Sequence, residues 1–145
     1  MEIKDIIDGI AIKLNEKFGY TMYVDEVPQG FKTPSFCIHM VSMIHDRELG
    51  NDISGRRWLV APLFDIQFFS DKGRSDLFQH SLQVQQALQQ IKLVNDDILL
   101  SVDQNTTIED DIAHNFMQFN IYLYDKQRET FMDSLSLDTR IRRVT

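Results

Sequence analysis

Two prolines, a glycine and two phenylalanines fall within one short segment, Val27-Pro28-Gln29-Gly30-Phe31-Lys32-Thr33-Pro34-Ser35-Phe36. Pro28 and Pro34 bias the residues before them away from helix, so we expect this segment to be extended or turned. Gly30 can adopt a positive φ angle that its bulky neighbours avoid. Because loops are usually polar, the two large aromatic side chains predict that this one packs against the fold or contacts a partner.

The segment separates a helix pattern from a strand pattern. Residues 2–18 are predicted to form a helix, because their apolar residues recur at helical spacing. Residues 20–24 are predicted to form a short strand, and residues 36–44 a longer one, because both are rich in β-branched and aromatic residues. The apolar stripe of the helix consists of Ile3, Ile6, Ile7, Ile10, Leu14 and Phe18.

Downstream of residue 44, strand patterns surround a second helix pattern. The predicted elements are strands over 57–69, 93–102 and 113–124 and a helix over about 75–91. Pro62 cannot donate to a strand ladder, so the strand around it is expected to begin late, to bulge or to lie at an edge. The predicted connections are a long polar hairpin or loop over about 45–57, an acidic link over 103–111, and a peripheral helix with a basic tail over about 129–145.

These elements predict an α+β fold. We expect a two-layer sandwich, in which two main helices pack on a mixed, mostly antiparallel sheet of about four to five strands. The 145 residues, of which 43% are hydrophobic, suffice for one domain with its own core, so residues 1–145 are predicted to form a single domain.

Composition excludes several classes of function. The net charge of −7 disfavours broad binding to nucleic-acid phosphates, and the only concentrated basic cluster is Arg140, Arg142 and Arg143. The single cysteine, Cys37, permits no internal disulfide and no multi-cysteine metal site. Charged residues near the N-terminus and the lack of a long apolar stretch predict an intracellular protein without a signal peptide or membrane span.

Histidine spacing gives no metal site. The four histidines, His39, His45, His80 and His114, show no ligand spacing on one helix. His39 and His114 lie in predicted strands and could converge with a carboxylate, but satisfied or surface histidines are the favoured interpretation.

The acidic residues of the last third of the chain suggest a metal-dependent hydrolase, because paired carboxylates hold Mg²⁺. They are Asp96, Asp97, Asp103, Glu109, Asp110 and Asp111. Turn chemistry is the favoured explanation of the same residues, because they cluster between predicted strands and aspartate is frequent in turns. No phosphate-binding loop or nucleophile elbow is present in the sequence. We therefore predict no catalytic, cofactor-binding or metal-binding residues and no enzymatic activity, and we keep the hydrolase as an alternative of another class.

Candidate contact residues come from two places. The first is the proline-rich segment, whose restricted backbone loses little freedom on docking. The second is a Trp beside two Arg, residue types that are enriched at interface hot spots. The candidates are Gln29, Gly30, Phe31, Lys32, Pro34, Arg56, Arg57 and Trp58.

The motif formed by Gln29, Gly30, Phe31, Lys32, Pro34 and Phe36, together with the aromatic strand 64–69, resembles the small tail-terminator family of long-tailed phages and prophages. The order of elements is also similar: a helix, a hairpin with the Gln-Gly-Phe-Lys-x-Pro link, a long strand pair, a second helix and a closing strand pair. The resemblance implies a non-enzymatic protein. The longer 45–57 segment and the basic C-terminal tail depart from the family pattern.

The resemblance also implies partners and a place of action. Family members form a ring, typically hexameric, at the head-proximal end of the tail tube. The expected partners are further copies of the chain, the major tail tube protein and a head-completion or connector protein, with DNA passing through the lumen without specific binding. The protein would act in the host cytoplasm during assembly and then in the virion tail. Another head–tail connector, neck or minor tail component is the alternative within the same class.

Overall fold

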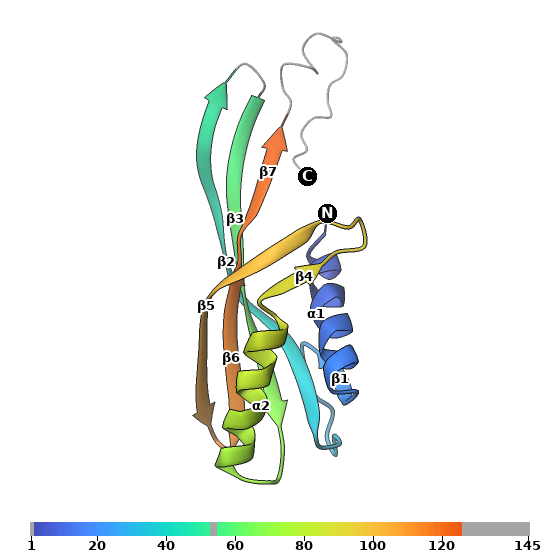
Figure 1. The fold of residues 1–145 in the computed structure, drawn as a ribbon. Coiled ribbons are helices and arrows are strands. Elements are labelled where there is room, and N and C mark those ends of the chain that lie inside the picture. The colour runs from blue at the N-terminus through green and yellow to red at the C-terminus, as the bar shows by residue number, and fades with distance from the viewer. Residues whose placement is uncertain (1, 53–54, 126–145) are drawn as a thin grey trace.

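The computed structural model describes residues 2–52 and 55–125, with the backbone alone for 45–58 and 123–125. Two helices and seven strands form an elongated molecule, in which both helices lie against the lower part of the sheet (Figure 1). In chain order the elements are α1 (Ile3–Lys17), β1 (Thr21–Val24), β2 (Ser35–Asp52), β3 (Gly55–Phe69), α2 (Arg74–Ala87), β4 (Gln90–Lys92), β5 (Ile98–Glu109), β6 (Ile112–Phe119) and β7 (Ile121–Asp125).

Both helices cover the same face of the sheet, which we call the covered face. On α1, the predicted apolar stripe is confirmed, because Ile6, Ile10 and Leu14 are fully buried. The helix begins after Glu2, whose backbone N–H donates to the Asp5 carboxylate at 2.9 Å. The core that the two helices close consists of Ile6, Ile10, Leu14, Phe36, Ile38, Phe64, Ile66, Phe68, Leu77, Val84, Leu88, Ile91, Leu93, Leu99, Ala113, Met117, Phe119 and Ile121.

The sheet is larger than the sequence predicted. Its strands follow the order β1-β2-β3-β6-β5-β4, and β7 pairs with β3 beyond the end of β6. The predicted α+β class is confirmed, but the prediction of four to five strands is wrong. One error is the predicted strand 113–124, which the structure divides at Asn120 into β6 and β7. Both parts pair with β3, so the break does not change their partner.

A second error concerns the acidic link. Residues 103–109 were expected to connect two strands, yet they continue β5, which pairs with β6. Exposed and partly buried side chains alternate along these residues, and most of them are polar on both faces, so the sequence resembles a loop. Residues 90 and 91, predicted to end the second helix, belong to β4 instead, and Ile91 packs into the core from a strand position opposite Leu99.

The first strand pair is parallel. β1 pairs with β2 from Thr21 opposite Ser35 to Val24 opposite Ile38. The hairpin implied by the family resemblance is therefore wrong at this place. Residues 25–34 instead carry the chain back to the start of β1, so that β2 can run alongside it in the same direction.

The β2–β3 pair extends well beyond the helices. Residues 45–57, predicted as a polar hairpin or loop, continue these two strands as far as Asp52 and from Gly55. We call the extension the arm: residues 41–52 of β2, residues 55–62 of β3, and β7, which projects beside them in Figure 1. The predicted region 129–145 lies outside the described residues.

Pro62 lies where the arm joins the body. It is buried and pairs with Met43 on β2, between two register shifts of that strand pair. On its other side, β6 ends at Phe119 and β7 begins at Ile121. Both register shifts insert their extra residue in β2, and β3 continues through Pro62 without a bulge of its own. The strand around Pro62 therefore does not begin late or lie at an edge. Pro62 lies instead between the residues of β3 that pair with β7 and those that pair with β6, at a point where the partner strand changes.

Candidate assembly surface

The proline-rich loop lies on the face of the sheet that the helices leave open. Phe69 alternates with the buried Phe68 and so points to the open face, where its ring centre lies 4.8 Å from that of Phe31. On the same face, Tyr23 pairs in register with Cys37, and its hydroxyl accepts the backbone N–H of Lys32 at 3.3 Å. The loop is thus anchored to the open face through one aromatic contact and one hydrogen bond.

The two phenylalanines of the loop segment have different roles. Phe36 is fully buried on the covered face, where it packs against Phe18 and Phe68. Phe31 is only partly buried, on the open face. Gly30 has a φ of 74°, as its position in the turn predicted, and the Thr33–Pro34 peptide is cis. The segment therefore both supports the core and presents a surface.

Most of the predicted contact residues of this loop are accessible. Gln29, Gly30, Lys32 and Pro34 are exposed, and Phe31 is half-buried against Phe69. Lys32 provides the positive charge among them. Because Phe31 is held by the sheet, the exposed neighbours are presented from a fixed base, which suits a docking surface.

The second set of predicted contacts lies at the other end of the molecule. The backbone of Arg56, Arg57 and Trp58 belongs to β3 near the tip of the arm, opposite Asn51, Gly50 and Glu48 of β2. Their side chains lie outside the described part of the chain. Phe69, which contacts the proline-rich loop, is twelve residues after Arg57 on the same strand, a separation on the order of 40 Å at the usual strand rise. The two sets therefore do not form one site.

A buried contact between Asp65 and His114 lies on the open face, and the sequence patterns did not identify it. The Asp65 side chain is 7% exposed, and its Oδ2 lies 2.8 Å from His114 Nδ1 and 3.3 Å from Gln67 Nε2. Its Oδ1 has no hydrogen-bond partner. His39 is the residue opposite Asp65 on β2, so the register places the two strand histidines and a carboxylate at neighbouring positions of the open face. The sequence signal for this contact is the position of Asp65 between Phe64 and Ile66. A charged residue inside such an apolar strand needs a polar partner.

The remaining described histidine is also satisfied. His80 stacks on Phe68 with ring centres 4.5 Å apart and contacts the hydroxyl of Tyr20 at 3.0 Å. Its Nδ1 lies 3.3 Å from the Asp76 carboxylate. Over the described ranges, no group of three or more histidine, cysteine, aspartate or glutamate side chains is placed to hold a metal ion.

Of the six acidic residues that suggested a hydrolase, Asp103 and Glu109 belong to strand β5 and the others lie in turns. Asp96, Asp103, Asp110 and Asp111 all have positive φ angles, which aspartate tolerates better than most residues. Asp110 and Asp111 form the two-residue turn between β5 and β6, where both central residues need positive φ. Asp103 lies at the register shift where β5 bends. Backbone geometry therefore explains why aspartate occupies these four positions.

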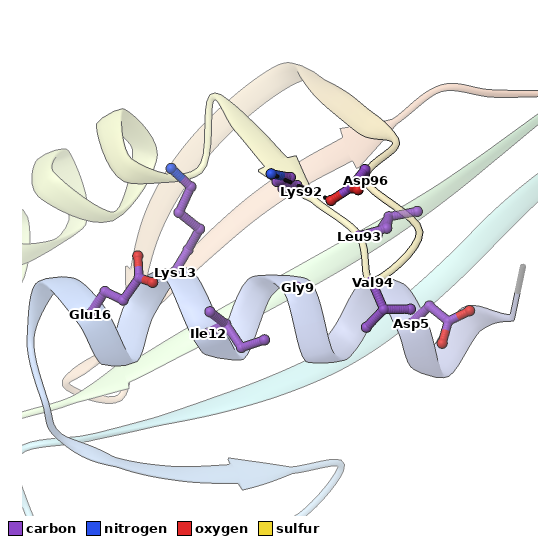
Figure 2. Close-up of a pocket in the computed structure, with 9 residues that line it drawn as sticks. All are labelled: Asp5, Gly9, Ile12, Lys13, Glu16, Lys92, Leu93, Val94 and Asp96. Carbon is purple, nitrogen blue, oxygen red and sulfur yellow. Dashed lines mark ion pairs between the residues drawn. The ribbon is translucent and has the colours of Figure 1, made fainter.

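A groove of about 410 Å³ lies between α1 and the turn that joins β4 to β5 (Figure 2). Gly9 allows the close approach, since a Cβ there would lie 3.3 Å from the Lys92 carbonyl oxygen. The ion pair of Lys92 and Asp96, at 3.4 Å, is largely exposed, and Val94 is 75% exposed. Because the charged groups of the groove are solvated or paired, we assign no ligand to it.

A comparison with protein families decides the class of the protein. A family model described as "Phage tail terminator protein" matches residues 5–130. The chain belongs to the phage tail terminator family. The match covers α1 from Asp5 onward, α2, the seven strands of the described residues, the proline-rich loop and the arm, and the family is one of structural tail proteins. No curated protein sequence matches this tail-terminator chain. No helix within the described ranges is long and apolar enough to cross a membrane.

Proposed function

We propose that this chain forms a ring at the head-proximal end of the phage tail tube, stops tube polymerisation there and provides the surface that joins the head-completion proteins. The ring is expected to be hexameric. The observation that supports this function best is the family match over residues 5–130, which covers most of the chain.

The shape of the molecule supports the proposal. A terminator needs one surface for the last tube ring and a different one for the next component, because a repeated surface would let growth continue. The proline-rich loop and the tip of the arm lie at opposite ends of the β2–β3 pair. The candidate contacts Gln29, Gly30, Phe31, Lys32 and Pro34 would serve one end. Arg56, Arg57 and Trp58 would serve the other.

The charge of the chain suits a ring through which DNA passes. With a net charge of −7, a lumen lined by this protein would repel phosphates and would not retain DNA. The partners in this proposal are further copies of the chain, the major tail tube protein and the head-completion or connector protein. Assembly would take place in the host cytoplasm, and the finished ring would remain in the virion tail.

A tube-growth experiment tests the function. Purified major tail tube protein of the same phage is polymerised alone and with increasing amounts of this chain, and tube lengths are measured by electron microscopy. A terminator shortens the mean length as the ratio of chain to tube subunit rises, and it is found at one tube end only. Unchanged tube growth would contradict termination and favour another connector or neck component.

The alternative of another class has its own assay. Phosphatase and nuclease activities are measured with and without Mg²⁺, for the native chain and for Asp110→Ala. Because Asp110 holds a positive φ angle in a two-residue turn, we expect no turnover by either protein. Mg²⁺-dependent turnover that Asp110→Ala abolishes would establish the hydrolase.

A further inference from the structure

The arm has two strand edges without a partner strand in the part of the chain that the structure describes. β1 occupies the outer edge of β2 only from Ser35 to Ile38, and one further bond joins the Asp25 N–H to the Ile38 carbonyl at 2.9 Å. From His39 onward, no described strand pairs with that edge. On the opposite side of the arm, β7 pairs with β3 alone. Free edges of this kind are available to strands of another chain.

The β2 edge lacks the residues that usually protect such edges. Proteins block exposed edges with lysine, proline or inward-pointing charges, and residues 39–44 contain none of these. Three apolar residues of this stretch are instead exposed: Val41 by 47%, Met43 by 40% and Ile44 by 55%. On β7, Tyr122 is 66% exposed. Apolar exposure at both edges favours a partner that covers them.

The strand directions identify which edges can meet. β3 is antiparallel to both β2 and β7, so β2 and β7 run in the same direction. Copies arranged around an axis along the arm would keep this direction, so β7 of one copy would meet β2 of the next in parallel. β2 already accepts a parallel partner, β1, on that same edge. Pairing between two β2 edges would instead be antiparallel and would stop at a dimer.

We propose that β7 of one copy adds to the free edge of β2 in a second copy, next to β1, so that the arms form one continuous sheet around the ring. The pairing would use Ser42–His45, the regular stretch between the register shifts at Met40/Ser42 and His45/Arg47. This inference rests on the proposed function, because a closed ring requires such a contact between two different edges of the chain.

The small area that this contact would bury predicts that it forms only when copies are already held close together. A strand pair of four or five residues buries much less than the roughly 1,600 Å² of a standard stable interface. Free copies would therefore associate weakly. Copies held side by side on the end of the tube would pair readily, because their effective concentration is high.

Cysteine cross-linking tests the geometry. Ile44 is opposite Ala61 on β3 and Tyr122 is opposite Leu59, two positions apart, so both side chains lie on the same face of the arm. Neighbouring strands bring Cα atoms to distances that a disulfide can bridge. The double variant Ile44→Cys/Tyr122→Cys is oxidised at high protein concentration, and products are separated by size without reductant. The native Cys37, 2% exposed, is retained in all variants.

The expected result is a ladder of linked copies from the double variant and only monomers from either single variant. Dimers from Ile44→Cys alone, without a ladder from the double variant, would overturn the proposal in favour of β2–β2 pairing. A double variant with no more linkage than the single variants would also overturn it.

A second experiment separates this proposal from the function on which it rests. Ile44→Lys places a charge on the edge, and Ile98→Lys, on β5, is the matched control because Ile98 is 56% exposed. In the tube-growth assay, Ile44→Lys is expected to lose length control while Ile98→Lys keeps it. If Ile44→Lys still limits tube length, edge pairing is wrong and termination stands. If the native chain does not limit tube length, the proposed function itself fails.

Discussion

The strands β2 and β3 run through both the arm and the rest of the protein, which we call the body. The two regions differ in how far the apolar side chains of β2 and β3 are exposed. In the body, β2 and β3 place Phe36, Ile38 and Phe68 on the covered face, with none of their surface exposed. In the arm, the same β2 leaves Met43 and Ile44 about half exposed. The difference shows where the packing of β2 and β3 against the helices ends. Exposed apolar side chains are not confined to the arm, since Ile12, Val94 and Leu100 are also more than half exposed.

The largest expected effect compares one side chain from each region. Phe68→Ala removes a ring that contacts Phe36, Tyr20 and His80 in the core, and we expect a loss of about 3–5 kcal/mol in the free energy of unfolding. Met43→Ala, on the arm, is expected to cost less than about 1 kcal/mol, because its side chain is already 40% exposed. Urea unfolding measures both. Equal losses would show that the arm is packed as tightly as the body.

The second prediction concerns the open face of the body. His114→Ala removes the 2.8 Å partner of the buried Asp65 carboxylate, whose Oδ1 already lacks a partner. We expect a loss of about 1.5–3 kcal/mol, the usual range for a hydrogen bond to a charged group. Adding Asp65→Asn should recover part of this loss, because a neutral amide costs less to bury than a carboxylate. Recovery in the double variant, measured by urea unfolding, distinguishes an unpaired charge from simple loss of imidazole packing.

The third prediction concerns the loop at the opposite end from the arm tip. Phe31→Ala is expected to lower stability by about 1–2 kcal/mol, less than a fully buried phenylalanine, because Phe31 contacts Phe69 from one side only. Gln29→Ala, in an exposed position, should change stability by less than about 0.5 kcal/mol. If the loop docks on another tail component, Gln29→Ala should nevertheless weaken length control in the tube assay. Unchanged length control would remove Gln29 from the contact set.

The sequence predicted the parts of this fold that local periodicity determines. The stripe of α1 and the alternation of β6 were predicted because each residue's face follows from its spacing. The parallel pairing of β1 with β2 was missed, since the choice of strand edge depends on contacts between distant residues. The second half of β5 was missed because it is rich in polar and acidic residues. Such a composition is common to turns and to exposed strand faces, and it does not distinguish them.

The candidate site was predictable to a similar extent. The loop was identified from its prolines and phenylalanines, and its anchoring to Phe69 fits the expectation that it packs on the fold. The loop and Trp58 lie at opposite ends of one strand pair. This separation follows from the β2–β3 register, which the sequence alone does not determine. The pair formed by Asp65 and His114 was left unassigned because the two residues are 49 positions apart in the chain.

The smallest expected effect is a difference in reactivity between two thiols on the same strand, β2. Cys37 lies in the body part of β2, where burial, and then the charges of Asp25 and Asp65, raise the pKa of its thiol above the ordinary value of 9.0. In Ile44→Cys, the new thiol lies in the arm part, at a position where the native side chain is 55% exposed. At pH 8 and low protein concentration, a thiol reagent should modify position 44 quickly and Cys37 only after urea unfolding.

The raised pKa of Cys37 also predicts how stability changes with pH. Above pH 9 the unfolded chain loses the thiol proton while the folded chain keeps it, so the unfolded state binds fewer protons and stability falls as pH rises. One group contributes at most about 1.4 kcal/mol per pH unit. Cys37→Ala should reduce this slope between pH 9 and 10, whereas Met43→Ala should leave it unchanged. Equal slopes, or rapid labelling of native Cys37, would show that the open face of the body is as accessible as the arm.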